Sequence, residues 1–356
     1  MATRVTLKQI AEEVGVSVMT VSRALNNRSN VDENTREKVV KVANRLGYRP
    51  NYIAKSLVTN KTYTIGVVVP EISHSFFPEI IRGIEEIMQK KNYQLILMHS
   101  EENERREKEA IDTLEAKRVD GILISMAETV NSFKQYRRLI KSEHPVVFYD
   151  RCARDIGATC VSVNDEESQK MITQHLIDHG YQKIAYLSGP IDVAIGKDRY
   201  SGFLKAMHEN GLEVRDEWIV QSGFQETGGY EAMSKLLSLP KEMRPRAVAA
   251  VNDPAAFGAM QAIYDHNLRI PEDVAIVGFS DDIRAKLMPC PLTTIHQPAY
   301  EVGKKAAKKL IDLIEGRSTE PEDIEIKTEL IIRESCGCKQ NFNKKFIDLK
   351  EKSLSK

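Results

Sequence analysis

The chain has 356 residues, 42% of them hydrophobic and 29% charged, which is typical of a soluble globular protein and excludes a disordered or fibrous chain. It is too long for one ordinary core, so two or three domains are expected. The formal net charge is zero, yet the first sixty residues hold ten lysines and arginines against five acids. A basic N-terminal segment of this kind either meets a polyanion or forms a solvated helical face.

Neither the cysteines nor the hydropathy pattern points to secretion or to a membrane. The five cysteines are odd in number and lack the dense spacing of a disulfide framework, so reduced thiols are expected. No N-terminal apolar stretch resembles a signal peptide, and no run approaches membrane-spanning length. We therefore expect a cytoplasmic protein without a membrane partner.

The first fifty residues predict three short helices. Thr6, with a glutamine three residues later, forms a capping box, while Ser17 and Asp32 are suited to cap a second and a third helix. Gly15 is suited to the positive φ of a tight turn between the first two helices, and Gly47 to the end of the third. This pattern is typical of a helix-turn-helix.

The second of these helices is the candidate DNA-reading element, because a helix-turn-helix places the start of its second helix nearest the base edges. Val18 and Met19 would be exposed apolar side chains there. Folding gives no reason for that exposure, but contact with the methyl groups of thymine does. Arg23 can pair with guanine, and hydroxyls and Arg36 suit phosphates. The alternative is a small helical domain that binds protein. The candidate DNA contacts are Thr6, Ser17, Val18, Met19, Thr20, Ser22, Arg23 and Arg36.

From residue 62 onward, short β runs alternate with amphipathic helices, which predicts an α/β fold with parallel sheets in two Rossmann-like lobes. The expected strands are Thr64–Pro70, Gln94–His99, Gly121–Ser125, Val146–Asp150, Cys160–Asn164, Lys183–Ser188, Ala247–Asn252 and Val274–Phe279. The expected helices include Phe76–Lys91, Asn103–Lys117, Glu166–His179, Arg199–Asn210 and Pro254–His266.

Polar and aromatic residues follow several of these strands, where ligands bind in open α/β sheets. Polar groups around aromatic faces suit a sugar, whose hydroxyls need hydrogen bonds and whose C–H face stacks on rings. The strand ends carry Ser75, Phe76, Phe77, Asp150, Arg151, Asn252, Asp253 and the run Ser280–Asp282. For the two phenylalanines, the alternative is ordinary core packing at helical spacing.

Several segments together make the chain resemble the LacI/GalR family of repressors over nearly its whole length. The matching segments are Thr6–Asn26, Thr35–Asn51, Ile65–Pro70, Arg199–Phe203, Val277–Phe279 and Pro291–Pro298. The resemblance implies an all-α helix-turn-helix head and a two-lobed core similar to periplasmic binding proteins. It also implies that Val18, Met19 and Arg23 read bases.

The family also folds a short hinge helix on DNA from two subunits side by side, and residues 51–58 match it. The resemblance implies that Asn51 caps this helix, that Ala54 and Lys55 enter the minor groove, and that Leu57 is wedged between bases. A helix of one or two turns is marginal alone, so DNA and a partner subunit should order it. Unstacking by Leu57 costs a few kcal/mol, which added contacts to bent DNA offset.

The resemblance likewise implies a set of cleft residues that contact a small effector. They are Phe76, Phe77, Asp150, Arg151, Arg199, Phe224, Asn252 and Ser280. Many sugar-responsive relatives carry an aspartate where this chain has Ser280, and we expect Asp281 to take its place. For Arg199 the alternative is a salt bridge between the lobes.

The sequence thus predicts a repressor that binds a pseudo-palindromic operator and responds to a sugar or sugar derivative, without a cofactor. A homodimer is expected, with a tetramer left open. The expected domains are a head (1–50), a hinge helix and linker (51–61), a core (62–340) and a polar tail (341–356). Within the core, lobe 1 is expected at about 62–160 and 292–322, and lobe 2 at about 161–291 and 323–340.

An enzyme and a transport receptor are the rival classes. The loop after the first strand lacks G-x-G-x-x-G, and no P-loop, G-x-S-x-G or H-E-x-x-H occurs. His175 and His179 could share a metal, and Cys336-x-Cys338 could be half of a site, but neither shows a second pair at ligand spacing. No metal is therefore expected. The added head and the absence of a signal peptide argue against a transport receptor.

Overall fold

The computed structural model describes residues 5–26, 30–49, 56, 61–128, 130, 132–153, 156–191, 193–317 and 320–338. The chain divides into two compact units, one up to Thr62 and one from Tyr63 onward. The hinge residues Asn51, Ala54, Lys55 and Leu57 lie outside the described residues, and so does the predicted tail.

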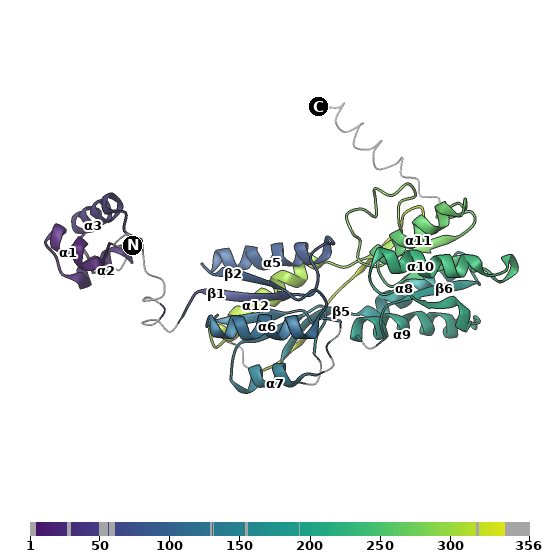
Figure 1. Cartoon of the computed structure of the whole chain (residues 1–356), viewed down its shortest axis with the longest axis horizontal. Helices are drawn as coiled ribbons and strands as arrows, with labels where there is room; N and C mark the ends of the chain where they lie inside the picture. The colour runs from purple at the N-terminus through teal and green to yellow at the C-terminus, as the bar shows by residue number, and fades with distance from the viewer. Residues whose placement is uncertain are drawn as a thin grey trace, which may run out of the picture. The chain divides into compact units, whose positions relative to one another are not determined.

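Among its described residues, the first unit has three helices, α1 (Leu7–Val14), α2 (Val18–Leu25) and α3 (Glu33–Leu46). Their contact faces are small and apolar, which allows three short helices to cross closely around one core. The buried residues of this core are Ile10, Ala11, Val21, Ala24, Val39 and Ala43. Figure 1 shows the three helices in purple.

The predicted helix ends of this unit are confirmed. Thr6 forms a complete capping box on α1, Ser17 accepts from the backbone N–H of Thr20, and Asp32 accepts from that of Thr35. Gly15 lies at φ 75° and ends α1 in the left-handed region. The turn between α1 and α2 is therefore set by local chemistry, as the sequence indicated.

The first lobe of the second unit is a six-stranded parallel sheet in the order β11-β5-β4-β3-β1-β2. Its strands are β1 (Thr64–Val69), β2 (Gln94–His99), β3 (Gly121–Ile124), β4 (Val146–Tyr149), β5 (Thr159–Val163) and β11 (Asp323–Ile326). Helices α5 (Phe76–Lys90) and α12 (Ala299–Ile314) cover one face, and α6 (Glu104–Ala116) and α7 (Lys134–Lys141) cover the other.

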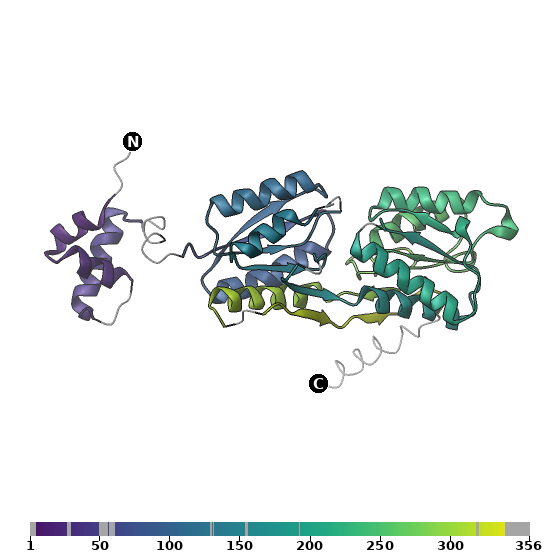
Figure 2. The same cartoon turned by 90° about the horizontal axis from the view of Figure 1, so that it is seen from below.

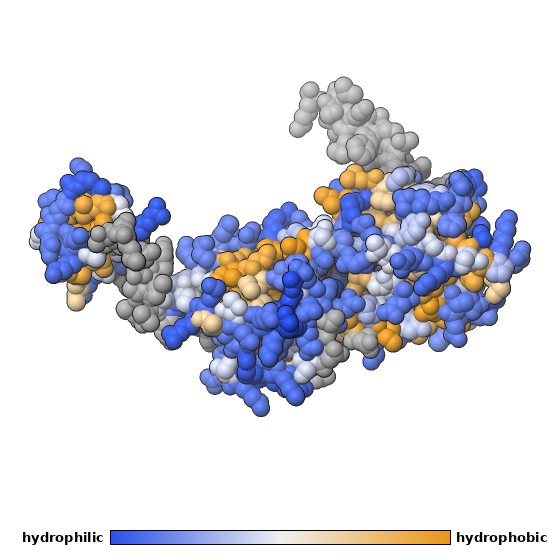
Figure 3. Space-filling view, viewed as in Figure 1, coloured by the Kyte–Doolittle hydropathy of each residue, from blue (hydrophilic) through white to orange (hydrophobic). Residues whose placement is uncertain are grey.

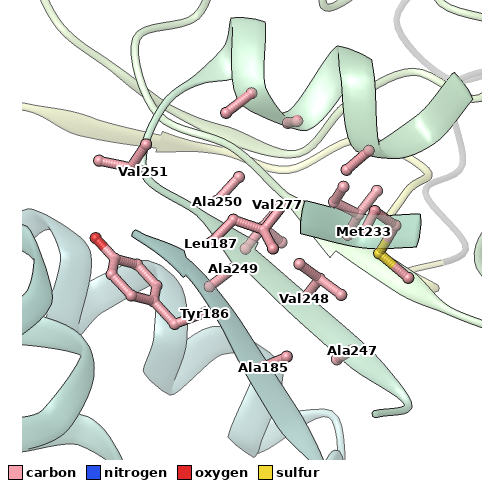
Figure 4. Close-up of a cluster of buried hydrophobic side chains, with 14 of the residues drawn as sticks. Ala185, Tyr186, Leu187, Met233, Ala247, Val248, Ala249, Ala250, Val251 and Val277 are labelled. Atoms are coloured by element: carbon pink, nitrogen blue, oxygen red, sulfur yellow. The ribbon is translucent and has the colours of Figure 1, made fainter. Parts of the chain in front are cut away.

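The second lobe is a four-stranded parallel sheet in the order β7-β6-β8-β9. Its strands are β6 (Ile184–Ser188), β7 (Ile219–Gln221), β8 (Ala247–Ala250) and β9 (Ala275–Val277), and its helices are α8 (Asp165–Asp178), α9 (Ala194–Glu209), α10 (Glu226–Ser238) and α11 (Asp253–Asp265). Figure 4 shows part of its core, with Met233 of α10 beside the alanine- and valine-rich strand β8.

The chain crosses between the lobes three times, and each crossing lies a few residues later than the sequence analysis placed it. Strand β5 pairs with β4 and β11 in the first lobe, so the first crossing follows Val163. Strand β10 (Thr294–His296) pairs with β12 (Glu329–Ile331) and packs on the second lobe, so the second follows β10. The third lies between β11 and β12, because β11 belongs to the first sheet. Figure 2 shows these connections running side by side between the lobes.

The expectation of reduced thiols is wrong for one pair of cysteines. Cys152 and Cys160 form a disulfide, with their Cα atoms 5.8 Å apart. Cys160 lies on β5 opposite Phe148 of the neighbouring strand β4, and Cys152 follows that same strand. Strand pairing therefore brings the two together, which their spacing in the sequence does not reveal. Cys290, Cys336 and Cys338 are free.

Candidate functional site

Helix α2 presents its first turn to solvent. Val18 is 44% exposed and Met19 is 61% exposed, whereas Val21 is fully buried against the head's core. The capping hydroxyl of Ser17 lies 3.1 Å from the amide nitrogen of Thr20, which fixes where the helix begins. The predicted exposure of two apolar side chains at the start of α2 is confirmed, and they are available to meet base edges.

The charged and polar side chains around α2 differ in how free they are. Arg23 is exposed, and Ser22 is half-buried beside it. Arg36 is more enclosed, since its side chain is only 16% exposed and its guanidinium lies 3.4 Å from both the Val31 carbonyl oxygen and a Glu33 carboxylate oxygen. Contact of these residues, and of Thr6 and Thr20, with DNA stays a prediction.

The core contains a pocket at the carboxyl ends of the strands, lined by residues of both lobes. The predicted effector residues that line it are Phe76, Phe77, Asp150, Arg151, Arg199, Phe224, Asn252 and Ser280. Phe76 and Phe77 meet edge to face with ring centroids 5.3 Å apart, and both also pack on the core of the first lobe. The two phenylalanines therefore both line the pocket and pack in the core, so the two predicted roles apply at once.

Arg199 is held from three sides within the second lobe. Its Nε donates to Asp165 at 2.7 Å, its Nη1 donates to the Val251 carbonyl at 2.8 Å, and its guanidinium lies 3.7 Å from the centroid of the Phe279 ring. Asp165 begins α8, so this ion pair does not join the lobes. The arginine is a buried, preorganised part of the pocket wall.

Asp150 and Arg151 enter the pocket from the end of β4. Burial raises the pKa of Asp150 to about 6, although the neighbouring Arg151 opposes the shift. Arg151 Nη1 donates to both carboxylate oxygens of Glu102, at 2.9 and 2.6 Å. Its guanidinium also lies 5.0 Å from the centroid of the Phe224 ring, which belongs to the other lobe.

Two hydrogen bonds among the described residues join the lobes beside the pocket. Ser75 Oγ donates to Asp282 Oδ2 at 2.9 Å, and His74 Nε2 lies 2.9 Å from Gln225 Oε1. Ser75 and His74 precede α5 of the first lobe, while Asp282 and Gln225 belong to the second. With the stacking of Arg151 on Phe224, these contacts hold the lobes together around the pocket.

Three predicted effector residues do not line the pocket. Ser75 is the interlobe contact described above. Asp253 is fully buried at the start of α11, where it accepts from Thr294 Oγ1 at 2.6 Å and from the Asp282 amide at 2.7 Å. Burial raises the pKa of Asp253 to about 7. Asp253 therefore holds the segment of Asp282 in place and does not itself line the pocket.

Asp281 does not take the place of an aspartate at position 280, contrary to the sequence-based expectation. It binds Arg333 at 2.6 Å and His296 at 3.1 Å on the second lobe. Burial alone would raise the pKa of Asp281, but these two hydrogen bonds hold that pKa below its usual value. The carboxylate that reaches the pocket beside Ser280 is that of Asp282.

Asp282, which the sequence placed at a strand end, also lines the pocket. Sequence reasoning missed several other lining residues, which are Glu71, His74, Glu102, Ile195, Gln225, Pro254 and Gln297. Gln297 is informative because it is 4% exposed, and no described residue gives its Nε2 a hydrogen-bond partner. The same holds for Arg151 Nε. Gln297 lies in a segment that carried the family resemblance. It was not expected at the site because it lies in an interlobe connection, whereas the candidate residues were sought directly after the strands of the main sheets.

A small helical unit with an exposed reading helix, followed by a two-lobed core with a polar and aromatic pocket, defines a ligand-responsive DNA-binding regulator. Residues 6–51 match the model for bacterial regulatory proteins of the lacI family. Residues 62–334 match the model for periplasmic binding proteins and the sugar-binding domain of the LacI family. The chain belongs to the LacI family, as its sequence motifs indicated.

Individual relatives agree with this assignment over almost the whole chain. The transcriptional repressor PurR of Mannheimia succiniciproducens is 35% identical, over 93% of this chain and 98% of its own length. The ribose operon repressor of Escherichia coli is 36% identical, over 89% and 94%. The lac repressor dimer bound to operator and the anti-inducer ONPF is 26% identical with a TM-score of 0.85, over 94% and 99%.

A fourth relative was solved with a sugar. The transcriptional regulator CelR in its cellobiose complex is 29% identical with a TM-score of 0.71, over 93% of this chain and all of its own. These relatives are transcription regulators and not enzymes, and the chain is likewise a DNA-binding regulator of transcription. Within the described part of the chain, no helix is both long and apolar enough to cross a bilayer.

Proposed function

We propose that the chain represses transcription by binding a pseudo-palindromic operator as a dimer, and that a sugar-like ligand in the interlobe pocket changes its affinity for DNA. The observation that carries the DNA-binding half is the exposure of Val18 and Met19 on the first turn of the capped helix α2. Arg23 follows on the same helix and supplies the guanine contact. Because the partner is chromosomal DNA, the chain acts in the cytoplasm.

The dimer is supported by an apolar surface on the first lobe. Strand β2 is the edge of its sheet, and Leu97 on this strand is 46% exposed between the half-buried Ile96 and Met98. Figure 3 shows apolar side chains gathered over this part of the lobe, near α5 and β2. An unpaired apolar edge is normally covered, and a second copy of the chain is the partner we propose. The lac repressor relative is a dimer on its operator.

A charge at this edge tests the dimer. Leu97→Glu should shift the protein toward monomers and weaken operator binding, because a dimer must desolvate the new carboxylate. Met243→Glu is the matched control, since Met243 is 37% exposed on the second lobe. Sedimentation velocity at several protein concentrations measures the association. A Leu97→Glu protein that remains as dimeric as the control would remove this edge from the interface.

The pocket's unsatisfied donors point to a ligand rich in hydrogen-bond acceptors. Gln297 Nε2 and Arg151 Nε are both buried without a partner among the described residues, and a buried donor of this kind is normally paired in the functional state. The carboxylates of Asp150 and Asp282 line the same space and can accept from hydroxyls. Donors and acceptors around the rings of Phe76 and Phe224 fit a polyhydroxylated ring.

The charge balance favours a neutral sugar over an anionic one. Both pocket arginines are already paired, Arg151 with Glu102 and Arg199 with Asp165. An anionic ligand would add negative charge beside the pocket carboxylates of Asp150 and Asp282 without meeting an unpaired cation. We therefore infer a neutral mono- or disaccharide, and the cellobiose complex of the CelR relative supports this class.

The effector acts on DNA binding by changing how the lobes meet. A ligand that bridges both lobes favours the closed arrangement held by Ser75, His74 and their partners, and it shifts the equilibrium only by its differential affinity. The test is operator titration at several salt concentrations, with and without a panel of neutral sugars. We expect a steep salt dependence, a preferred inverted repeat and a change in affinity with one sugar class. Salt-independent binding or the lack of an inverted repeat would contradict the proposal.

A further inference from the structure

Two pairs of metal-ligand side chains, far apart in the sequence, lie together on the second lobe. His175 and His179 are four residues apart at the end of α8 and so share one face of the helix. Cys336 and Cys338 follow β12 in the segment that returns to this lobe after the third crossing. In the sequence each pair lacked a second pair at ligand spacing, and the fold supplies it.

The ligand atoms are within reach of one ion. The imidazole of His175 and the sulfurs of Cys336 and Cys338 have ligand atoms that all lie within 4.8 Å of one another. Cys338 Sγ is 3.6 Å from His175 Nε2 and 2.7 Å from His179 Nε2. The histidines also lie side by side, with ring centroids 4.4 Å apart. Three ligand atoms thus lie close to one another, and His179 Nε2 adds a fourth through its contact with Cys338.

The histidine tautomer follows from a backbone contact. His179 Nδ1 lies 2.7 Å from the carbonyl oxygen of His175. A carbonyl can only accept, so Nδ1 carries the hydrogen in this contact and the neutral ring presents the lone pair of Nε2. That lone pair is on the side of Cys338. A ring nitrogen held by a carbonyl in this way is the usual support of a metal-binding histidine.

The cysteine segment is also held in shape. Gly337 lies at φ 89°, a conformation that side chains rarely adopt, and its amide donates to the Glu334 carbonyl at 2.9 Å. Tyr181 Oη donates to the Cys336 carbonyl at 3.3 Å. Thr293 Oγ1 donates to Cys336 Sγ at 3.1 Å, and this hydrogen bond helps to fix the position of the buried sulfur. The turn therefore keeps both sulfurs close to α8.

We propose that His175, His179, Cys336 and Cys338 bind one divalent transition-metal ion of the zinc class. Two thiolates and two imidazoles are a borderline-soft donor set that selects zinc over magnesium or calcium. Four protein ligands leave no open position, so the ion is structural and takes no part in catalysis. The free thiols of Cys336 and Cys338 fit this role, whereas Cys152 and Cys160 are consumed in a disulfide.

The ion would join two interlobe connections. Helix α8 begins directly after the first crossing, and the cysteine segment follows the third. Bound metal therefore clamps the C-terminal segment, up to at least Cys338, onto the lobe that carries half of the effector pocket. Because ligand deprotonation and folding are coupled to metal binding, the ion should raise the stability of this lobe.

The test measures metal binding to the untagged full-length protein. The protein is stripped with a chelator under mild reduction and titrated with Co²⁺, whose thiolate charge-transfer and ligand-field bands report tetrahedral sulfur and nitrogen ligation; Zn²⁺ is then added in competition. Thermal melting is followed with and without Zn²⁺. We expect one ion per chain, displacement of Co²⁺ by Zn²⁺, and a higher melting temperature for the zinc-bound protein.

Variants keep the assignment falsifiable. His179→Ala changes an exposed residue and should leave the fold intact while it weakens Co²⁺ binding by at least about tenfold. Cys338→Ser should abolish the thiolate bands or weaken them as strongly. The matched controls are His208→Ala, an exposed histidine at the end of α9, and Cys290→Ser, the remaining free cysteine. Absence of Co²⁺ binding to the wild-type chain, or unchanged binding by either ligand variant, would overturn the four-ligand site.

Discussion

Ser75 Oγ donates a hydrogen bond to Asp282 Oδ2 at 2.9 Å, and this bond joins the first lobe of the core to the second. Ser75 immediately precedes α5 of the first lobe, and Asp282, which lines the pocket, follows β9 of the second, so the bond crosses between the lobes beside the pocket. Burial alone would raise the pKa of Asp282, but hydrogen bonds from Arg284 and Ser75 hold that pKa below its usual value. The carboxylate is therefore ionised near neutral pH and accepts strongly from the serine.

Ser75→Ala should loosen the closed arrangement of the lobes. The lost bond is worth about 1 kcal/mol, so the affinity for an effector that requires closure should fall several-fold. Isothermal titration calorimetry with the effector found in the sugar panel measures the change. Ser238→Ala is the matched control, because that hydroxyl donates to the Lys235 carbonyl of its own helix, far from the pocket lining. Equal effector affinity in the two variants would show that the Ser75–Asp282 bond does not contribute to closure.

Gln297→Leu should weaken ligand binding without lowering the stability of the ligand-free protein, so the two effects can be told apart. The substitution keeps the side chain's size but removes a buried amide whose Nε2 has no described partner, so the ligand-free protein should melt at the same or a higher temperature. A ligand that accepts from this amide should lose roughly 1–3 kcal/mol of binding free energy. Differential scanning fluorimetry and calorimetry measure the two effects.

The control for this substitution is Gln261→Leu on α11, where the amide donates to Asp265 at 2.7 Å on the exposed surface. That variant should leave effector binding unchanged. If Gln297→Leu destabilised the ligand-free protein and left effector affinity intact, Gln297 would be a structural residue of the connection and not a ligand contact.

The features that were predicted correctly from the sequence are formed by residues close to one another along the chain. The caps of α1, α2 and α3 join residues three positions apart, so the same residues that signal a helix end also form it. Eight of the ten strands that the structure describes in the two main sheets were found, because most strands of a parallel sheet are nearly continuous apolar runs. The strands β7 and β11 were not expected, since they are short edge strands with partly exposed patterns. Helices α7, α10 and α12 were not singled out, and α9 begins five residues before its predicted start at Arg199.

What the sequence could not predict depends on pairing between distant segments. Arg199 was weighed as an interlobe salt bridge or a ligand contact, but its carboxylate partner is Asp165 at the start of α8 in the same lobe. Removing Arg199 would leave that buried carboxylate uncompensated, at about 3–5 kcal/mol, so an alanine at this position would report on stability as well as on the effector. The pairing of β5 with β11 and the approach of Cys338 to α8 are equally long-range.

Glu107 should make the first lobe less stable as the pH rises. This carboxyl is fully buried on α6, where Tyr136 Oη donates to it and the Ala127 amide donates at 2.6 Å. Burial raises its pKa from 4.5 to about 7. The folded state thus keeps a proton that the unfolded chain loses between pH 4.5 and 7. Its contribution to stability is complete below pH 4.5 and is lost as the pH rises through 7.

Glu107→Gln should remove this pH dependence, which amounts to at most about 3 kcal/mol between pH 4.5 and 8. Chemical denaturation of wild type and variant at pH 5 and pH 8 measures it. We expect wild type to lose more stability than the variant over this interval. Parallel losses in the two proteins would show that Glu107 is ionised in the folded state at both pH values.

Arg23 should determine one base pair in each half of the operator. It is exposed on α2 beside the capped first turn, and its rigid planar guanidinium can donate two parallel hydrogen bonds to the O6 and N7 atoms of a guanine. Arg23→Ala should therefore cost roughly 1–3 kcal/mol of specific binding and relax the preference at that position. Arg23→Lys keeps the charge but loses the rigid fork, so it should retain nonspecific affinity and show a weaker base preference than wild type.

The matched control is Lys41→Ala, which removes a positive charge from an exposed position on α3. Lys41 lies outside the proposed base-reading helix, so its loss should leave the selected operator sequence unchanged and at most reduce the salt dependence slightly. Binding-site selection from a random library, followed by titration of the selected site and of single-base variants, compares the four proteins. Should Arg23→Ala and Arg23→Lys select the same site as wild type, the base-reading face of α2 would have to be reassigned to Val18, Met19 and the residues around them.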